Sequence, residues 1–480
     1  MKQSLGKGTV YLMLAELVAL VSSYAVQVGV ARFLGPEVYG IFGVITALYL
    51  INRAFLNTGI PRATSKFVAE SKDKVNAIFK TSLKLQLWSG LVFTLFYVFF
   101  ARFIAGILKD ASLTPYIIYL GLMVVPLALL ALYSTGYMNG LRLFKEQAKI
   151  KILYPLLQAV FTFILVLFGF KIYGVLTGYL LSTLVGLYLS WKYVRITDSD
   201  EAVFPVKKLL LFAIPISLSA LFFTLMRNVN TLFVKSILVD NATVGLFTAA
   251  ATLSSLPFSV FGALPVTLLP AVSGSIATGN LHLTRKYISK SVRYLLLILL
   301  PLSAIVAATA SQILGLLYPN SYQAAASTLA ILIFASTFLA IFTTLNAIIV
   351  GSGRPILQLM TVSLSVVLLA ALNILLIPLF GIVGSALASL ISSFVAVVLD
   401  GFHVYRHFGK FFDVVSTIRI VLCTLIVYLV ARHWHFNSIG LILYTIVLAL
   451  FYLLLLFLVG ELNMGDWHFG RKLMFFWKKE

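Results

Sequence analysis

The N-terminal region contains two long apolar runs, KGTVYLMLAELVALVSSYAVQVGVARF at 7–33 and EVYGIFGVITALYLINRAFLNTGI at 37–60. Each run is long enough to cross a hydrocarbon core, which needs roughly 20 residues of helix. The two runs therefore predict a helical hairpin that spans the membrane twice. Each predicted helix carries one ionisable residue well inside the membrane, Glu16 in the first and Arg53 in the second.

A charged side chain at that depth costs several kcal/mol unless it is paired or faces water, so it indicates a functional site. Glu16 and Arg53 lie at similar depths in neighbouring predicted helices. Two interpretations stay open for them. They form a structural ion pair between the helices, or they line a wet cavity that serves as a functional site. A paired Arg53 that lines a cavity would satisfy both interpretations.

The whole chain has a membrane composition, with 61% hydrophobic and 11% charged residues among 480, whereas charged residues make up about 25% of soluble proteins. We therefore predict an all-α polytopic membrane protein without a soluble domain. About fourteen transmembrane helices are predicted, at 7–33, 37–60, 79–101, 113–138, 151–170, 172–194, 209–236, 243–272, 288–311, 323–350, 356–378, 382–405, 413–432 and 438–460.

The net charge of +21 is explained better by membrane topology than by a nucleic-acid partner. With the N-terminus inside, six of the 36 Lys and Arg residues fall on the outer side, Arg53 and Arg227 lie within the membrane, and the other 28 lie inside. Basic residues concentrate in cytoplasmic loops. We therefore predict a multi-pass protein of the cell membrane with both termini in the cytoplasm and no nucleic-acid partner.

Two inner segments have distinctive compositions. Residues 62–84 mix Lys and Arg with Phe67, Val68, Ile78 and Phe79, which predicts an amphipathic segment lying along the anionic inner leaflet. The stretch 195–208 is the most polar part of the chain. It predicts a linker between two halves.

Short matches on either side of this linker indicate an internal repeat. LGPEVYGIF at 34–42 matches VDNATVGLF at 239–247, which aligns Gly40 with Gly245, and two further pairs have similar offsets: NGLR at 139–142 with VGSGR at 350–354, and KIYGVLTGYLLS at 171–182 with FGIVGSALASLIS at 380–392. An even number of helices per half gives the halves the same orientation, with a pseudo-two-fold axis along the membrane normal. The predicted parts are an N-terminal lobe (1–196), a cytoplasmic linker (197–208), a C-terminal lobe (209–408) and two extra helices with a basic tail (409–480).

Several motifs resemble one known superfamily. They are RFLGPEVYGIFG at 32–43, GIPRATSKFVAE at 59–70, NGL at 139–141, GSGRP at 351–355 and IPLFGIVGSALAS at 377–389. Together they resemble the Wzx-type polysaccharide or O-antigen unit flippases, bacterial and archaeal, of the multidrug/oligosaccharidyl-lipid/polysaccharide exporter superfamily. The resemblance implies two six-helix lobes in a V shape around a central cavity, plus two C-terminal helices.

The same resemblance implies transport of a polyprenyl-(pyro)phosphate-linked oligosaccharide from the cytoplasmic to the outer leaflet by alternating access. The expected partners are this lipid-linked substrate, membrane lipids and a glycan polymerase or ligase, and the expected state is a monomer.

One position departs from the family's pattern. Asn230 stands in RNVNTLF where many relatives have an Asp in the seventh helix, which removes an acidic ion-coupling group there.

The substrate's anionic head needs fixed cations in a wet cavity, because it cannot cross hydrocarbon unaided. Arginine suits phosphate, since its planar fork stays charged and binds bidentately. Arg53 and Arg227 are therefore the candidate phosphate-binding residues, with Asn228 and Asn230 beside Arg227. Further polar residues that either line the cavity or bond between helices are Gln27, Asn52, Asn57 and Asn346. Arg32 and Lys235 are predicted to snorkel to the outer interface.

The predicted eighth helix carries Pro257, Pro265 and Pro270, which either form a hinge for lobe closure or give a static kink. Asp400, His403 and His407 share a helical face at a spacing that can bind a metal, but the inner end of that helix is expected to be wetted. We predict no metal site and no cofactor, and the energy source, H⁺ or Na⁺ coupling included, stays open.

Two other functional classes would need different residues. A cation-coupled multidrug or metabolite exporter on the same scaffold would use intramembrane carboxylates, of which the chain offers chiefly Glu16. A membrane-embedded glycosyltransferase or ligase would need a catalytic carboxylate or a sizeable outer domain. Since the sequence has no Walker motif, no HExxH and no convincing Ser/His/Asp arrangement, we predict that the protein is not an enzyme.

Overall fold

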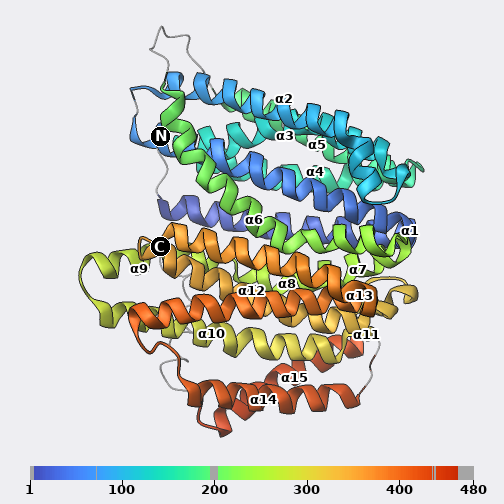
Figure 1. Cartoon of the computed structure of the whole chain (residues 1–480), viewed down its shortest axis with the longest axis vertical. Helices are drawn as coiled ribbons and strands as arrows, with labels where there is room; N and C mark the ends of the chain where they lie inside the picture. Colours follow the sequence, from blue (N-terminus) through green and yellow to red (C-terminus); the bar gives the residue numbers. More distant parts are fainter. Residues whose placement is uncertain (1–4, 72, 195–203, 435, 437–438, 463–480) are drawn as a thin grey trace. The chain divides into compact units, whose positions relative to one another are not determined.

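The computed structural model describes residues 5–71, 73–194, 204–434, 436 and 439–462. Every regular element in these ranges is helical (Figure 1). The elements are α1 (Leu5–Glu70), α2 (Val75–Ile107), η1 (Ala111–Leu113), α3 (Thr114–Ala131), η2 (Leu132–Met138), α4 (Phe144–Leu167), α5 (Lys171–Tyr193), α6 (Val206–Leu238), α7 (Asn241–Ser254), α8 (Leu256–Phe261), α9 (Ala263–Ala277), α10 (Leu281–Ala308), α11 (Ala310–Leu317), η3 (Asn320–Ala325), α12 (Ala326–Gly351), α13 (Pro355–Phe408), α14 (Val414–His433) and α15 (Ile439–Leu458). The prediction of an all-α chain is confirmed.

The two longest helices are each interrupted by a glycine with positive φ. In α1 this residue is Gly35 (φ 76°, ψ 174°), and in α13 it is Gly381 (φ 57°, ψ −135°). Only glycine adopts such angles without strain, and in Figure 1 the ribbon of α1 reverses direction. Twelve spans in the described ranges are long and apolar enough to cross a membrane. Because α1 and α13 each contain two helices, this finding agrees with the predicted fourteen.

The predicted eighth span, 243–272, is broken into three pieces. The chain leaves α7 at Ser254, passes through the short α8 and resumes as α9 at Ala263. Pro257 lies in the first turn of α8, Pro265 in the first turn of α9 and Pro270 inside α9. Proline removes a backbone donor and clashes with the preceding turn, which explains the breaks. Movement at these breaks stays a prediction.

The described chain divides into two compact units. Unit 1 comprises residues up to Thr252 together with Val366–Ser385, and unit 2 comprises Leu253–Ser365 together with the residues from Ala386 onward. The lobe boundaries predicted from the repeat stay a prediction. Most of the predicted linker, residues 197–203, lies outside the described residues.

The core of unit 1 corrects one prediction. Phe67, Val68 and Ile78 are buried in one cluster with Phe204, and Phe79 is buried against Tyr133 and Tyr137 in another. Residues 62–70 complete α1 and residues 75–84 begin α2. The predicted amphipathic segment on the membrane surface is therefore wrong, because its apolar residues fill the core of the helix bundle.

Repeat-related residues contact each other at one end of unit 1. A Cβ atom at Gly40 would lie 1.8 Å from the Asn241 carbonyl oxygen, and a Cβ at Gly245 would lie 2.0 Å from the Pro36 carbonyl oxygen. Gly40 and Gly245 have the same sequence offset as Pro36 and Asn241. Such a reciprocal contact is what a two-fold axis between equivalent surfaces produces. It supports the parallel repeat predicted from the sequence.

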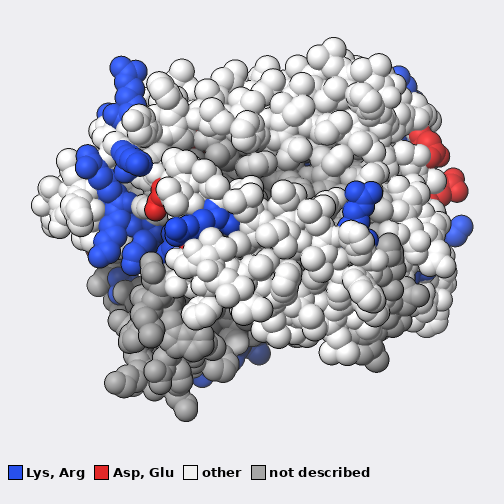
Figure 2. Space-filling model, turned by 90° about the horizontal axis from the view of Figure 1, so that it is seen from below, with Lys and Arg blue, Asp and Glu red and all other residues white. Residues whose placement is uncertain are grey.

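Basic side chains gather mainly toward the left of the face shown in Figure 2. In unit 2, basic residues of α10 and of the turn before α13 contact the C-terminal end of α13. Arg285 of α10 donates to the Phe408 carbonyl oxygen, and an Arg354 guanidinium nitrogen lies 3.3 Å from His407 Nδ1. This clustering is compatible with a cytoplasmic end.

Candidate functional site

Arg53 lies in the second helix of α1, and its side chain is exposed although the residue sits well inside a predicted membrane span. It interacts electrostatically with Glu16 and with the phenols of Tyr49, Tyr154 and Tyr179. The Tyr49 and Tyr154 hydroxyl oxygens lie 3.2 Å apart. Because exposure of a guanidinium to lipid at this depth would cost several kcal/mol, its exposed face requires water or a polar ligand.

Arg227 lies in α6 and is also exposed. It interacts electrostatically with Tyr24 of α1, whose hydroxyl donates to the Thr252 carbonyl oxygen at 3.1 Å. Both candidate cations therefore belong to unit 1, whereas the sequence assigned Arg53 to the N-terminal lobe and Arg227 to the C-terminal lobe.

The packing of α6 on α1 sets the relative depth of the two arginines. A Cβ at Gly59 would lie 1.9 Å from Ser217 Oγ, so the helices touch there. Arg53 precedes Gly59 by six residues and Arg227 follows Ser217 by ten. At about 1.5 Å per residue, both arginines lie on the same side of this contact, at about 9 and 15 Å from it. The two cations are thus separated by about 6 Å in depth, on helices in contact.

The predicted polar residues divide into bonded and unsatisfied groups. Both amide atoms of the buried Asn52, and Asn57 Oδ1, are buried without a hydrogen-bond partner. Gln27 Oε1 accepts from the Tyr39 hydroxyl at 3.0 Å, and Asn228 Nδ2 donates to its own helix at the Thr224 carbonyl oxygen. Unsatisfied amides one and four positions from Arg53 are groups that a hydroxyl-rich ligand or water can satisfy.

Asn230 is buried in unit 1 and joins two helices. Its Oδ1 accepts from Asn373 Nδ2 at 2.8 Å, and Asn373 Oδ1 accepts from Ser385 Oγ at 2.7 Å. This network uses α6 and both helices of α13. Asn230 is therefore placed as an interhelical contact, while its role toward a substrate stays a prediction.

The ion pair of Glu16 differs from the predicted one. Glu16 Oε1 lies 2.8 Å from Lys151 Nζ of α4, and Glu16 interacts with Arg53 only electrostatically. Of the two interpretations left open, a direct ion pair between Glu16 and Arg53 is not formed, because α4 packs against α1 and brings Lys151 to the acid. Ion coupling through Glu16 stays a prediction.

Lys235, predicted to snorkel, is only 1% exposed. Its Nζ donates to Asp110 Oδ2 at 2.7 Å, to the Val239 carbonyl oxygen at 2.7 Å and to Asn241 Oδ1 at 2.6 Å. Burial alone would raise the pKa of Asp110, but hydrogen bonds from Lys235, Ser112 and Asn241 lower it to about 2. The snorkelling prediction is wrong, because three oxygen acceptors satisfy the ammonium inside the protein.

Asp400 also departs from its prediction. Asp400 itself is not wetted, since it is 0% exposed and accepts from Asn346 Nδ2 at 2.6 Å, whereas His407 on the same helix face is exposed. The interhelical-bond interpretation of Asn346 is confirmed by the same contact.

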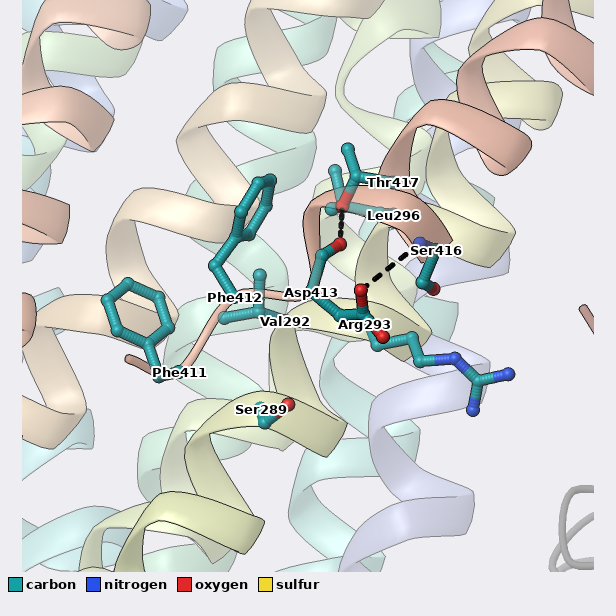
Figure 3. Close-up of a pocket in the computed structure, with 9 residues that line it drawn as sticks. All are labelled: Ser289, Val292, Arg293, Leu296, Phe411, Phe412, Asp413, Ser416 and Thr417. Carbon is teal, nitrogen blue, oxygen red and sulfur yellow. Dashed lines mark hydrogen bonds between the residues drawn. The ribbon is translucent and has the colours of Figure 1, made fainter. Parts of the chain in front are cut away.

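Most polar groups that line a pocket in unit 2 already have hydrogen-bond partners (Figure 3). Asp413 caps α14 by accepting from the backbone N–H groups of Val415 and Ser416. Arg293 donates to Glu461 Oε1 at 2.9 Å, and Thr417 Oγ1 donates to the Asp413 carbonyl oxygen. Asp413 therefore stabilises the start of α14, and the pocket leaves few polar groups for binding a large cargo.

The comparison with known families decides the classification. A family model described as "Polysaccharide biosynthesis protein" matches residues 5–276, more than half of the chain. The chain belongs to the polysaccharide biosynthesis protein family. This membership confirms the resemblance found in the motifs and makes the chain a membrane transporter of that family.

Relatives of this family member include archaeal and bacterial proteins. An uncharacterized membrane protein of Methanocaldococcus jannaschii is 25% identical over 431 residues, 84% of this chain and 98% of the relative. Stage V sporulation protein B of Bacillus subtilis is 24% identical over 329 residues, 62% of this chain and 63% of that protein.

Two solved structures share the fold. The lipid II flippase MurJ in an inward closed conformation matches with a TM-score of 0.76 at 14% identity, covering 93% of this chain and 97% of that one. An inward-facing multidrug resistance transporter of the MATE family, in the MOP superfamily, matches with a TM-score of 0.72 at 16% identity, covering 83% and 98%.

Sequence reasoning missed the surroundings of the two arginines. Lys151, Tyr24, Tyr49, Tyr154 and Tyr179 all lie in or beside apolar helices. Tyrosine is common at membrane interfaces, so a tyrosine in an apolar run gives a weak signal by itself. Tyr154 and Tyr179 come close to Arg53 only when α4 and α5 pack beside α1, which the sequence does not show.

Proposed function

We propose that this family member flips a polyprenyl-(pyro)phosphate-linked oligosaccharide from the cytoplasmic to the outer leaflet by alternating access. The observation that carries the proposal is the pair of exposed arginines, Arg53 and Arg227, at membrane depth on contacting helices of unit 1. Fixed cations at this depth are costly unless they are paired or face water, so two exposed arginines on contacting helices support a wet, anion-binding cavity.

The chemistry of the site fits the two ends of such a substrate. The guanidinium groups would bind the phosphate oxygens bidentately. Unsatisfied amides of Asn52 and Asn57, with the phenols around Arg53, would bind sugar hydroxyls. The polyprenyl tail needs no protein site, because it stays in lipid.

Alternating access requires an outer closure that can open. The contact of Gly40 with Asn241 and the ion pair of Lys235 with Asp110 join residues from the two predicted lobes. In the proposed cycle these contacts separate when the outer side opens, and the breaks at Ser255 and Gly262 absorb the change. Both termini lie in the cytoplasm in this proposal.

The likeness to a lipid II flippase and to a MATE multidrug transporter supports the scaffold. Because both share the fold, it does not separate a lipid-linked sugar from a drug as the cargo. An anionic lipid-linked sugar is favoured over a cationic drug because Arg53 and Arg227 are exposed at membrane depth, whereas the exposed acid at that depth, Glu16, is already paired with Lys151. Polymerase or ligase partners and a monomeric state belong to the same proposal.

The test is flipping of a labelled polyprenyl-diphosphate-oligosaccharide in proteoliposomes. Removing one arginine loses charge-assisted hydrogen bonds of about 1.5–3 kcal/mol each, so Arg53→Ala and Arg227→Ala should each slow flipping at least about tenfold. Arg102→Ala, an exposed arginine near the end of α2, is the matched control and should flip like the parent.

Two results would contradict the proposal. One is a parent protein that moves no lipid-linked sugar yet exports a cationic drug in a Glu16-dependent way. The other is flipping that survives both arginine substitutions at equal folded amounts. Each would favour the exporter alternative or another cargo-binding surface.

A further inference from the structure

A buried acid in unit 2 takes no part in the proposed cargo site. Asp400 lies in the second helix of α13 and is fully buried. Its Oδ2 accepts from Asn346 Nδ2 of α12 at 2.6 Å, and the Thr361 hydroxyl of the first helix of α13, which donates to the Gln358 carbonyl oxygen, lies beside it. Three transmembrane helices therefore meet at one carboxyl group.

Two oxygens of this cluster have no donor. Asp400 Oδ1 and Asn346 Oδ1 are both buried without a hydrogen-bond partner. An ionised carboxylate and an amide oxygen are acceptors only. Leaving a buried acceptor unsatisfied costs about 1–3 kcal/mol, so the ionised form of Asp400 leaves two such costs in place.

The charged groups on the neighbouring elements either contact groups other than Asp400 or are exposed, as Lys286, Lys290 and Arg406 are. From α10, Arg285 bonds the Phe408 carbonyl oxygen and Arg293 bonds Glu461. From the turn between α12 and α13, Arg354 contacts His407, and on the same helix as Asp400, His403 Nδ1 bonds the Leu399 carbonyl oxygen. The interactions described for Asp400 are with the neutral groups of Asn346 and Thr361. A buried carboxylate without a cation costs several kcal/mol.

We propose that Asp400 and Asn346 form a proton-binding site. One proton on Asp400 removes the uncompensated charge and provides the donor that the Asn346 oxygen lacks. A metal ion fits less well, because hard cations take six or more oxygen ligands or retain water. The cluster offers two unpartnered oxygens and one hydroxyl among the described residues.

A route for the proton follows one helix face. His403 and His407 lie three and seven residues beyond Asp400, and side chains at such spacings are neighbours on a helix. His407 is exposed at the end of α13, beside Arg354. At about 1.5 Å per residue, the path from Asp400 to His407 is about 10 Å long. Water at that end is the source and sink of the proton.

This inference deepens the proposed function by naming a coupling ion, yet proton binding is measurable without transport. The first experiment is infrared difference spectroscopy of the purified full chain while the pH is stepped upward. The parent and Asp73→Asn, which replaces an exposed acid, should show the loss of a protonated carboxyl band. Asp400→Asn should lack this band, and its amide can still donate to Asn346, so the variant should fold.

Three infrared results would overturn the site. Asp400→Asn could show the same band as the parent, or the Asp400 band could persist at every pH, which would mean a permanently held proton. The third is loss of the band on adding Na⁺ at constant pH, which would mean a sodium site.

The second experiment measures flipping with and without a pH gradient. The parent should respond to the gradient, and Asp400→Asn should flip at the same rate with and without it. An equal response to the gradient in both proteins would overturn the coupling role. If the parent flips no lipid-linked sugar, the proposed function fails while the infrared result still decides proton binding.

Discussion

Two acids of this chain, the partly buried Asp110 and the fully buried Asp400, have opposite surroundings. Asp110 of unit 1 faces the ammonium of Lys235, which is satisfied by three oxygens, and its pKa is lowered to about 2. Asp400 of unit 2 faces an amide and a hydroxyl, and one of its oxygens has no partner. The first arrangement holds a fixed charge and stabilises helix ends. The second arrangement leaves a carboxyl group whose charge can change.

The largest expected effect is removal of the cation in the first site. Lys235→Met leaves the carboxylate of Asp110 and the oxygens around it without their donor, and breaking a buried pair in this way costs about 3–5 kcal/mol. Thermal or denaturant unfolding in detergent measures the loss. Arg102→Met should unfold like the parent, and an equally stable Lys235→Met protein would show that the pair is not a structural contact.

A double substitution sharpens the same point. Replacing both partners, Lys235→Met with Asp110→Leu, removes the unpaired charge as well, and apolar replacement of a buried pair is often neutral. The double variant should therefore recover most of the stability lost in Lys235→Met. A double variant as unstable as the single one would mean that packing, and not charge, was lost.

The next contrast compares the same substitution at the two acids. Asp110→Asn removes a charge that Lys235 requires and should cost about 1.5–3 kcal/mol, the range for hydrogen bonds to charged groups. Asp400→Asn mimics the protonated acid and should change stability by less than about 1 kcal/mol. Unfolding of the two variants beside the parent at neutral pH measures the difference. Equal losses of stability in the two variants would contradict the assignment of a fixed charge to Asp110 and a protonatable group to Asp400.

The smallest expected effect is the acid dependence of Asp110. Because its folded-state pKa, about 2, lies below the value of about 3.9 for an unfolded chain, its contribution is present above pH 4 or so and is lost as the pH falls toward 2. The parent should lose stability relative to Asp110→Asn over this range. A constant difference between the two proteins would contradict the assigned ion pair.

Composition and hydrophobic run length predicted most of the fold, because a 20-residue apolar stretch has few alternatives in a membrane. The hairpins at Gly35 and Gly381 and the breaks near Pro257 and Pro265 follow from local backbone chemistry. The prediction that residues 62–84 lie on the membrane surface failed, because an amphipathic pattern is the same whether its apolar face contacts lipid or other helices.

The site was harder to predict because pairing is a tertiary property. Glu16 and Arg53 were recognised as unusual by depth alone, but the partner of Glu16 is Lys151, 135 residues away. Lys235 and Asp110 are separated by 125 residues, and no local pattern joins them. Asp400 was placed on a helix face correctly, whereas its burial depends on where α12 packs.

The central claim is that Arg53 and Arg227 recognise the phosphate of a lipid-linked sugar. The most direct measurement is the binding affinity of the purified protein for a polyprenyl-diphosphate-oligosaccharide and for the same sugar on an uncharged polyprenol. The parent and Arg102→Ala should prefer the diphosphate strongly, and Arg53→Ala with Arg227→Ala should lose most of that preference while still binding the sugar weakly. An undiminished preference in the double variant would contradict the account.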